Sequence, residues 1–190
     1  MPTSVVAGSV PRMAHTVYYV ASSVDGFIAD ADDRIDWLEQ FGFTAFEDDY
    51  EKFLAGIGAI VMGAATYDFL LAQPNLEWPY PGIPTWVLTH RELPTIEGAQ
   101  SVFWAGDISQ LDAELREAAG DRDVWVVGGG NVAAQFADAG LLDELRVTIM
   151  PIIVGSGKPL LPTTRPTTPL LLVRTTPFEG GAVEHVYRLT

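Results

Sequence analysis

Three consecutive glycines, Gly128–Gly130, stand where a strand-like run passes into a helix-like run. Residues 123–127 (DVWVV) are β-branched and aromatic, and residues 132–139 suit a helix that Asn131 could cap. Without side chains, backbone N–H groups are open to phosphate oxygens, and the helix dipole adds a favourable positive potential. The pattern predicts an anion-binding turn, although a tight strand-to-helix connection would use the same residues.

The same arrangement occurs earlier in the chain. Gly63 follows the short apolar run 59–62 and precedes a helix expected over residues 66–71. Thr66 could donate a hydrogen bond to a phosphate, or it could be an ordinary hydroxyl at a helix start. Two such turns after two strands are stronger evidence than one, because ligands of open α/β sheets gather at the carboxyl ends of the strands.

A third expected strand, residues 85–88 (TWVL), runs into Thr89, His90 and Arg91. These residues offer a hydroxyl and cationic groups in a chain that has few cations. Arg91 is therefore a candidate partner for a phosphate, with a solvated salt bridge as the alternative.

Bulk composition excludes several other functions. Among 190 residues, 25 are acidic and 11 basic, which gives a formal net charge of -14. A surface of this sign repels nucleic acid and acidic membranes. Cysteine is absent, and the three histidines, His15, His90 and His185, lack the spacing of metal ligands. No metal, nucleic-acid or membrane partner is therefore expected, and a cytoplasmic location fits the lack of cysteine.

The elements expected to position these residues alternate between strand and helix. Further strands are expected over 16–21, 102–104, 144–154, 170–175 and 183–189, and further helices after Thr44 and after Ser109. Thr44 with Glu47 has the spacing of a capping box, and Gly120 should end the second of these helices. Residues 22–33 are expected to be mostly loop. The order predicts an α/β fold with a mixed, mainly parallel central sheet flanked by helices and an antiparallel C-terminal edge.

The domain organisation is simple. Residues 1–13 are expected to form a flexible leader, and residues 14–190 a single domain. The proline-rich loop 73–84 carries Trp78 and Tyr80, which could contact a ligand, although packing is the commoner use of such residues.

Six segments in a fixed order resemble one known family. They are YVASSVDGFIA (19–29), MGAATY (62–67), VLTHR (87–91), VGGGN (127–131), LDEL (142–145) and PIIVGSGKPL (151–160). The ordered set is similar to the dihydrofolate-reductase-like superfamily, in the branch of the riboflavin-biosynthesis reductase C-terminal domain. The resemblance spans Val17 to Leu189.

The resemblance implies a reductase with NADPH as hydride donor, NADH being possible, and a homodimer formed through the C-terminal strands. It implies the following positions for the cofactor: Ala21, Asp25, Gly26 and Ile28 around the nicotinamide; Gly63 and Thr66 beside the pyrophosphate; Thr89, His90 and Arg91 beside the 2′-phosphate; and Gly128, Gly129, Gly130, Asn131 and Val132 on the other side of the phosphates. The cofactor would carry the chemistry, and the protein would orient it and exclude water.

Two departures from the family bear on specificity and catalysis. Ala64 stands where these reductases commonly place an arginine, which removes one cationic contact to NADPH. The stretch 34–38 is the only one comparable to the tryptophan loop and helix carboxylate of folate reductases, so Asp36 is the candidate substrate-side carboxylate. On this basis, dihydrofolate itself is not expected to be the substrate. We expect a reductase of a small pterin- or pyrimidine-like or carbonyl-type compound.

Two alternatives stay open. The first is a non-catalytic dinucleotide-binding or assembly protein on the same scaffold, which the missing arginine and proton donor favour. The second is a plain α/β domain whose triple glycine is only a turn.

Overall fold

The computed structural model describes residues 14–189, so the leader expected over residues 1–13 lies outside the described part of the chain. Its elements follow in this order: β1 (Thr16–Ser23), β2 (Phe27–Asp30), α1 (Asp36–Glu39), α2 (Glu47–Ala55), β3 (Ile57–Gly63), α3 (Ala64–Leu71), β4 (Thr85–Leu88), β5 (Ser101–Trp104), α4 (Ile108–Ala119), β6 (Asp123–Gly128), α5 (Gly130–Asp138), β7 (Glu144–Met150), β8 (Gly157–Pro159), β9 (Leu171–Pro177), a short 3₁₀ turn (Glu179–Gly181) and β10 (Val183–Arg188).

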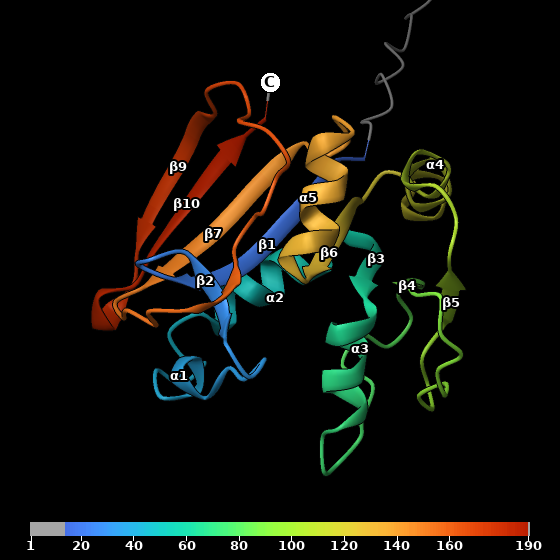
Figure 1. The fold of residues 1–190 in the computed structure, drawn as a ribbon, viewed down its shortest axis with the longest axis horizontal. Coiled ribbons are helices and arrows are strands. Elements are labelled where there is room, and N and C mark those ends of the chain that lie inside the picture. Colours follow the sequence, from blue (N-terminus) through green and yellow to red (C-terminus); the bar gives the residue numbers. More distant parts are fainter. Residues whose placement is uncertain (1–13, 190) are drawn as a thin grey trace, which may run out of the picture.

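The central sheet has the strand order β5-β4-β3-β6-β1-β7-β10-β9, and a separate small sheet joins β2 to β8 (Figure 1). All neighbours from β5 to β7 are parallel, whereas β10 is antiparallel to both β7 and β9. The mainly parallel sheet with an antiparallel C-terminal edge is therefore confirmed, as is the turn through Glu179–Gly181 between the last two strands.

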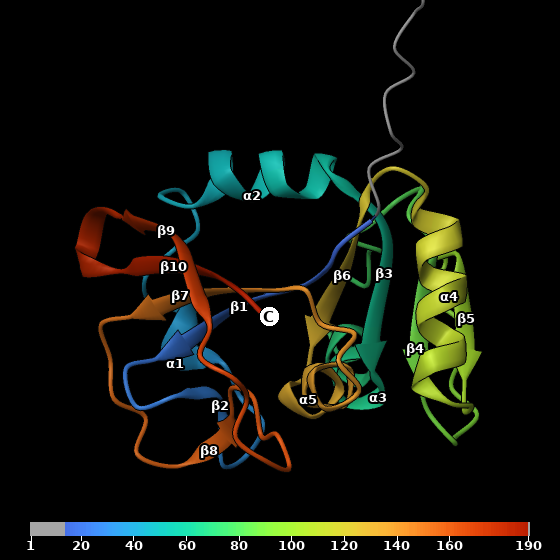
Figure 2. The same cartoon turned by 90° about the horizontal axis from the view of Figure 1, so that it is seen from above.

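Both faces of the sheet are covered, because alternate residues of its inner strands point to opposite sides. In β6, Val124 and Val126 pack into one apolar cluster together with α4 and α5. Trp125 packs into a second cluster with Tyr80 and with the apolar side of α2. Figure 2 shows α2 and α5 on opposite sides of the sheet. Trp78 and Tyr80 are buried in this second cluster, so they serve packing, as the commoner interpretation expected.

The sheet divides between β1 and β6. These two strands pair only from Thr16 to Tyr18, whereas β1 stays paired with β7 as far as Ser23. The outer half of β1 has therefore parted from β6 at the carboxyl end of the sheet. This division leaves room for ligands where the sequence predicted a site.

Several expected helix starts differ in the structure. Helix α2 begins at Glu47 after a tight turn in which the N–H of Phe46 donates to Phe43, so Thr44 caps nothing. Helix α4 is capped by Asp107, whose Oδ1 accepts from the N–H of Ser109 at 2.8 Å. The helix was expected to begin after Ser109, but it begins at Ile108, because the Asp107 carboxylate is a stronger acceptor than a serine hydroxyl. Gly120 does end α4.

The expected strand and loop boundaries change in two places. Strand β7 stops at Met150, one residue before Pro151, which cannot donate to a ladder. The segment expected to be mostly loop contains β2, which pairs with β8 across the end of the sheet. This pairing is between segments far apart in the sequence, so local composition could not reveal it.

Candidate functional site

Two glycine turns meet at the carboxyl edge of the sheet. Gly63 is the N-cap of α3 and Gly129 is the N-cap of α5, and no described side chain caps either helix. A β-carbon placed on Gly63 would lie 3.0 Å from Cγ2 of Val132 and 3.8 Å from the carbonyl oxygen of Gly128. The two uncapped helix starts are therefore neighbours, and their free N–H groups form one cradle for an anion.

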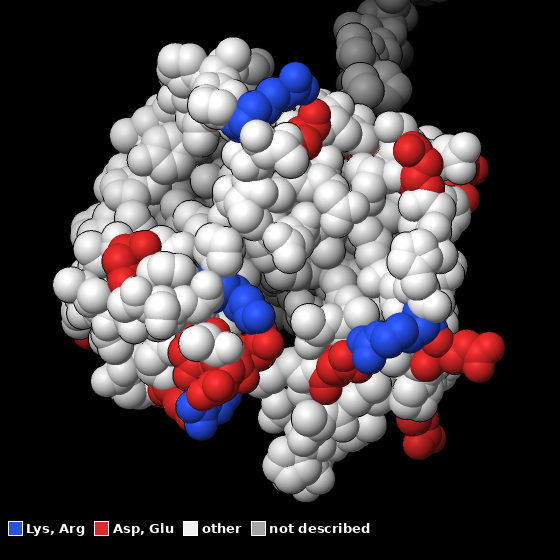
Figure 3. Space-filling model, in the orientation of Figure 1, with Lys and Arg blue, Asp and Glu red and all other residues white. Residues whose placement is uncertain are grey.

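Side chains from α3 and β2 approach the same cradle. A β-carbon on Gly128 would lie 3.1 Å from Oγ1 of Thr66, and one on Gly129 would lie 4.0 Å from Cδ1 of Ile28. Figure 3 shows the surface hollowed between the lobe that carries α1 and β2 and the lobe that carries α3. The predicted residues Ile28, Thr66 and the first two glycines of the triplet are thus brought together.

The third glycine has a packing role. A β-carbon on Gly130 would lie 2.4 Å from the carbonyl oxygen of Pro159 and 2.7 Å from that of Leu160. The residue must therefore be glycine so that the segment after β8 can pass over the start of α5. Asn131 is exposed within α5 and does not cap it, contrary to our expectation, because the helix already begins at Gly130.

Asp25 and Gly26 form the turn between β1 and β2. The Asp25 carboxylate accepts hydrogen bonds from the backbone N–H of Val154 at 3.0 Å and of Gly155 at 2.7 Å. A hydrogen bond with Ser23 and these backbone bonds lower the pKa of Asp25 from 3.8 to about 2. Gly26 has a φ of +84°, and its carbonyl accepts from the N–H of Leu160. Asp25 thus ties the turn to the segment that follows β7.

Thr89, His90 and Arg91 follow β4 at the same edge, beyond α3. The hydroxyl of Thr89 accepts from the N–H of Arg91 at 2.9 Å. The Arg91 guanidinium forms an ion pair with Asp68 of α3, with Nη2 2.5 Å from Oδ2. His90 and Arg91 are exposed. The cation that could face a 2′-phosphate therefore already has an anionic partner.

A cavity of about 260 Å³ lies beside the divided part of β1. Its lining is mostly aromatic and aliphatic and comprises Tyr19, Val20, Ala21, Leu38, Gly42, Phe43, Phe46, Tyr50, Trp125, Thr148 and Met150. Ala21 and Thr148 face each other as register partners in β1 and β7. Its mostly apolar walls with a few hydroxyl groups have the character of a small-molecule site.

Charged groups lie behind this cavity. The guanidinium carbon of Arg146 is 4.5 Å from the ring centroid of Tyr19 and 5.3 Å from that of Phe53. Arg146 Nε is 2.5 Å from Oε2 of the fully buried Glu184, whose Oε1 is 2.8 Å from Nη2 of Arg174. Burial raises the pKa of Tyr19, an effect that Arg146 opposes. The phenol therefore stays neutral at physiological pH.

Asp36 does not line the cavity. It is exposed at the start of the short helix α1, and Leu38 is the residue of that helix that reaches the lining. The lining residues that sequence reasoning missed, above all Tyr19 and Thr148, come from strands whose register only the folded sheet shows. A signal was present only for Phe46 and Tyr50, which follow the helical spacing of α2.

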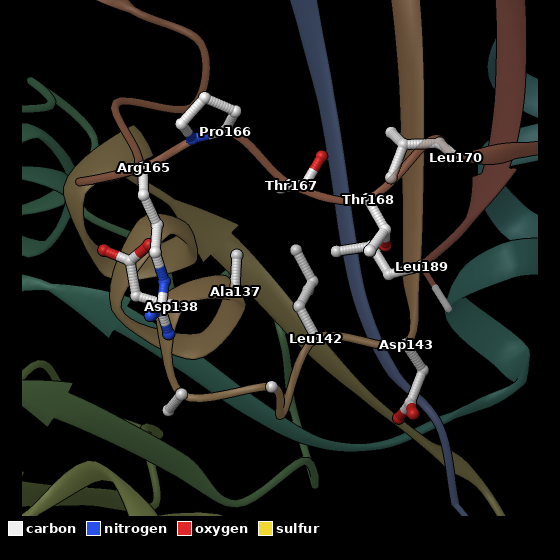
Figure 4. Close-up of a pocket in the computed structure, with 12 residues that line it drawn as sticks. Ala137, Asp138, Leu142, Asp143, Arg165, Pro166, Thr167, Thr168, Leu170 and Leu189 are labelled. Atoms are coloured by element: carbon white, nitrogen blue, oxygen red, sulfur yellow. The ribbon is translucent and has the colours of Figure 1, made fainter.

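A second hollow, of about 480 Å³, lies at the other end of α5 (Figure 4). Asp138 and Arg165 stand on one side of it, and Leu142, Leu170 and Leu189 on the other. It opens near the amino end of β7, away from the glycine cradle. It is therefore separate from the candidate site.

The described residues hold neither a metal-binding cluster nor a membrane-spanning helix. Within residues 14–189, no group of histidine and acidic side chains is arranged to hold a metal ion. In the same range, no helix has both the length and the apolar character that a membrane span requires.

The sheet and the paired glycine turns have the dihydrofolate-reductase-like fold. The dihydrofolate reductase of Enterococcus faecalis, solved with NADP(H), superposes with a TM-score of 0.66 at 16% identity, covering 94% of this chain and 98% of that one. The bifunctional deaminase and 5-amino-6-(5-phosphoribosylamino)uracil reductase of Thermotoga maritima superposes with a TM-score of 0.71 at 17% identity, covering 94% of this chain and 57% of that one. At these identities, the likeness establishes the fold.

Among proteins with this fold, this chain belongs to the RibD C-terminal domain family, whose model matches residues 80–183. The Bacillus subtilis protein YyaP is 30% identical over 180 residues, which cover 88% of this chain and 91% of YyaP. The riboflavin biosynthesis protein RibD of Corynebacterium ammoniagenes is 30% identical over 161 residues, covering 77% of this chain but only 45% of RibD. The family that the sequence motifs resembled is thus confirmed.

Proposed function

We propose that this protein is an NADPH-dependent reductase that transfers hydride to a small heterocyclic or carbonyl-type compound held in the aromatic cavity. The position of Ala21 carries the proposal. Ala21 lines the cavity, and it lies on the part of β1 that has parted from β6, the strand that leads into the glycine cradle. A dinucleotide at the cradle and a ring in the cavity would therefore share one gap in the sheet.

The residues present fit a nicotinamide dinucleotide. Two uncapped helix starts, Gly63 and Gly129, offer N–H groups to a diphosphate, and a side chain at Gly63 or Gly128 would crowd the cradle. When bound, NADPH supplies the hydride. The chain itself would bind the phosphates through these N–H groups and Thr66, orient the cofactor along β1 and β2, and exclude water with the aromatic lining.

The choice between NADPH and NADH rests on few side chains. Ala64 offers no cation at the start of α3, and Arg91 is paired with Asp68. A 2′-phosphate would have to compete with that carboxylate. We therefore expect a preference for NADPH that depends on Arg91 and is smaller than a free arginine would provide.

A fluorescence titration with NADPH and with NADH tests the cofactor, because five tryptophans report on binding. Thr66→Val should weaken binding of both dinucleotides by about tenfold, the worth of one hydrogen bond to a charged group. Ser109→Ala, which removes an exposed hydroxyl at the start of α4, is the matched control and should bind like the parent. Failure of the parent to bind either dinucleotide would overturn the proposal.

A non-catalytic dinucleotide-binding protein is the second candidate, and one observation favours it. No described residue that lines the cavity carries a carboxylate, and Asp36 stands outside. A reductase would then need water or a hydroxyl group to deliver the proton. Oxidation of NADPH in the presence of pterin, pyrimidine and carbonyl compounds separates the two candidates, since a binding protein would show no turnover with any of them.

We further propose a homodimer formed through the edge strand β9. Its residues Leu171, Leu172 and Val173 are each about half exposed, and an unpaired edge of this kind favours pairing with another strand. Light scattering at micromolar concentration tests this, with Leu172→Lys as the disrupting variant. A monomeric parent would contradict it.

A further inference from the structure

The walls of the aromatic cavity carry no charge. Of the described residues that line it, five are aromatic, and none is basic or acidic. The rings of Tyr50 and Phe53 both contact Trp125 edge-on, with centroids 6.0 Å and 5.3 Å apart. Their mutual packing holds these rings in place, so the cavity offers rigid aromatic surfaces to a ligand. Such walls suit a flat ring compound that stacks.

The polar groups of the cavity are neutral hydroxyls. Thr148 lies beside the phenol of Tyr19, while Tyr50 lies beside Tyr80, which is outside the lining. Burial raises the pKa of both Tyr19 and Tyr50, so both phenols keep their protons at physiological pH. The pair formed by Tyr19 and Thr148 can donate to or accept from a ligand but cannot balance a full charge.

The cation behind the cavity is not available to a ligand. Arg146 lies against the ring of Tyr19 and is held by Glu184, and its side chain is 11% exposed. Glu184 also holds Arg174, so the buried carboxylate is shared between two guanidinium groups. If Arg146 turned to bind a phosphate, the buried negative charge of Glu184 would lose one of its two cationic partners. Such a loss costs free energy.

We call the first turns of the two helices that line the cavity its rim, and these turns are acidic. Helix α1, which supplies Leu38, has Asp36 and Glu39 in its first turn. Helix α2, which supplies Tyr50, begins with Glu47, Asp48 and Asp49. The basic residue of α2, Lys52, is itself paired with Asp49 at 3.8 Å. A ligand that enters past this rim meets a negative potential, which disfavours a phosphate.

We infer that the cavity selects an uncharged, planar ring compound that carries no phosphate, held by stacking and by the Tyr19–Thr148 hydroxyl pair. This inference rests on the proposed reductase function and names the substrate class for the same site. The inferred substrate class differs from the substrate of the Thermotoga maritima enzyme, whose name specifies a phosphoribosylated pyrimidine.

Three probes test the inference by quenching of tryptophan fluorescence, since Trp125 lines the cavity. They are lumazine, which is a flat ring compound without a sugar, 5-amino-6-ribosylaminouracil, and the 5′-phosphate of that nucleoside. The last two compounds differ only in the phosphate. Lumazine and the nucleoside should bind, and the phosphorylated compound should bind at least about tenfold more weakly. Raising the salt concentration should narrow this difference, because the repulsion acts across solvent.

Variants of the rim and of the cavity test which residues cause the discrimination against phosphate and which bind the uncharged probes. The rim variant Glu39→Lys/Glu47→Lys changes one exposed residue on each of the helices α1 and α2 and should reduce the discrimination against phosphate to less than about threefold. The control Glu114→Lys/Glu117→Lys makes the same change of net charge on the exposed side of α4 and should leave the discrimination intact. Valine has nearly the same shape as threonine but no hydroxyl group. Thr148→Val should therefore weaken the binding of both uncharged probes about tenfold.

The outcomes are distinct for the inference and for the proposed function. Equal or tighter binding of the phosphorylated compound overturns the substrate class, and so does NADPH binding with none of the three probes bound. If the uncharged probes bind as expected but neither dinucleotide binds, the selectivity of the cavity stands and the reductase proposal falls. Equal discrimination in the rim variant and its control would remove the electrostatic explanation and with it the inference.

Discussion

The guanidinium of Arg146 lies over the ring of Tyr19, with 4.5 Å between the guanidinium carbon and the ring centroid. Glu184 holds the guanidinium there from β10, so one buried carboxylate positions an aromatic wall of the cavity. The antiparallel edge of the sheet therefore contributes to the candidate site without lining it. This link between the C-terminal strands and the cavity can be tested.

Glu184→Gln should destabilise the protein by roughly 3 kcal/mol, because it leaves the buried Arg146 without its anionic partner. Arg174→Gln should cost at most about 1 kcal/mol, since the side chain of Arg174 is 46% exposed. Urea unfolding of the two variants and the parent measures both values. Equal losses of unfolding free energy in the two variants would show that Glu184 does not hold the ion pairs with Arg146 and Arg174 together.

Asp68→Asn should increase the preference for NADPH over NADH by several-fold. The substitution removes the carboxylate that now neutralises Arg91 and so leaves the guanidinium for a 2′-phosphate. Arg91→Ala should have the opposite effect: it should weaken the binding of NADPH about tenfold and change the binding of NADH little. Parallel titrations with both cofactors check this. Unchanged preference in both variants would place the 2′-phosphate elsewhere.

Asp25 should contribute a pH-dependent part of the stability. Its folded-state pKa of about 2 lies below the usual 3.8, so its stabilising effect is present above about pH 4. The effect is lost as the pH falls toward 2. Asp25→Asn should therefore be less stable than the parent at pH 6, and the difference should vanish near pH 2. Urea midpoints across this range measure it, and a constant difference would contradict the assignment.

Gly130→Ala tests whether the third glycine of the triplet serves packing or binds the ligand. The new methyl group would meet the carbonyl oxygens of Pro159 and Leu160, which should cost about 1–3 kcal/mol. Gly56→Ala is the milder comparison, since its β-carbon would lie 3.3 Å from the nearest atom, the carbonyl oxygen of Phe53, and needs a shift of only a few tenths of an ångström. Unchanged stability of Gly130→Ala with loss of NADPH binding would instead assign this glycine to the ligand.

The sequence by itself determined the alternation of strands and helices, the fold class and the two glycine turns. These follow from local patterns: apolar runs that end at glycine and helical spacing after it. The cradle formed by Gly63 and Gly129 could be predicted because the carboxyl ends of parallel strands share one edge of a sheet. The ordered motifs also identified the family.

Only the tertiary structure decided which side chains face the cavity. Ala21 and Thr148 become partners through the register of β1 and β7, and Glu184 reaches Arg146 through the pairing of β10 with β7. Asp36 was the predicted substrate-side carboxylate, yet the path of the chain after β2 leaves it exposed. Register and the course of loops depend on contacts between distant segments, and a one-residue shift would turn each side chain to the other face. Local sequence cannot encode that choice alone.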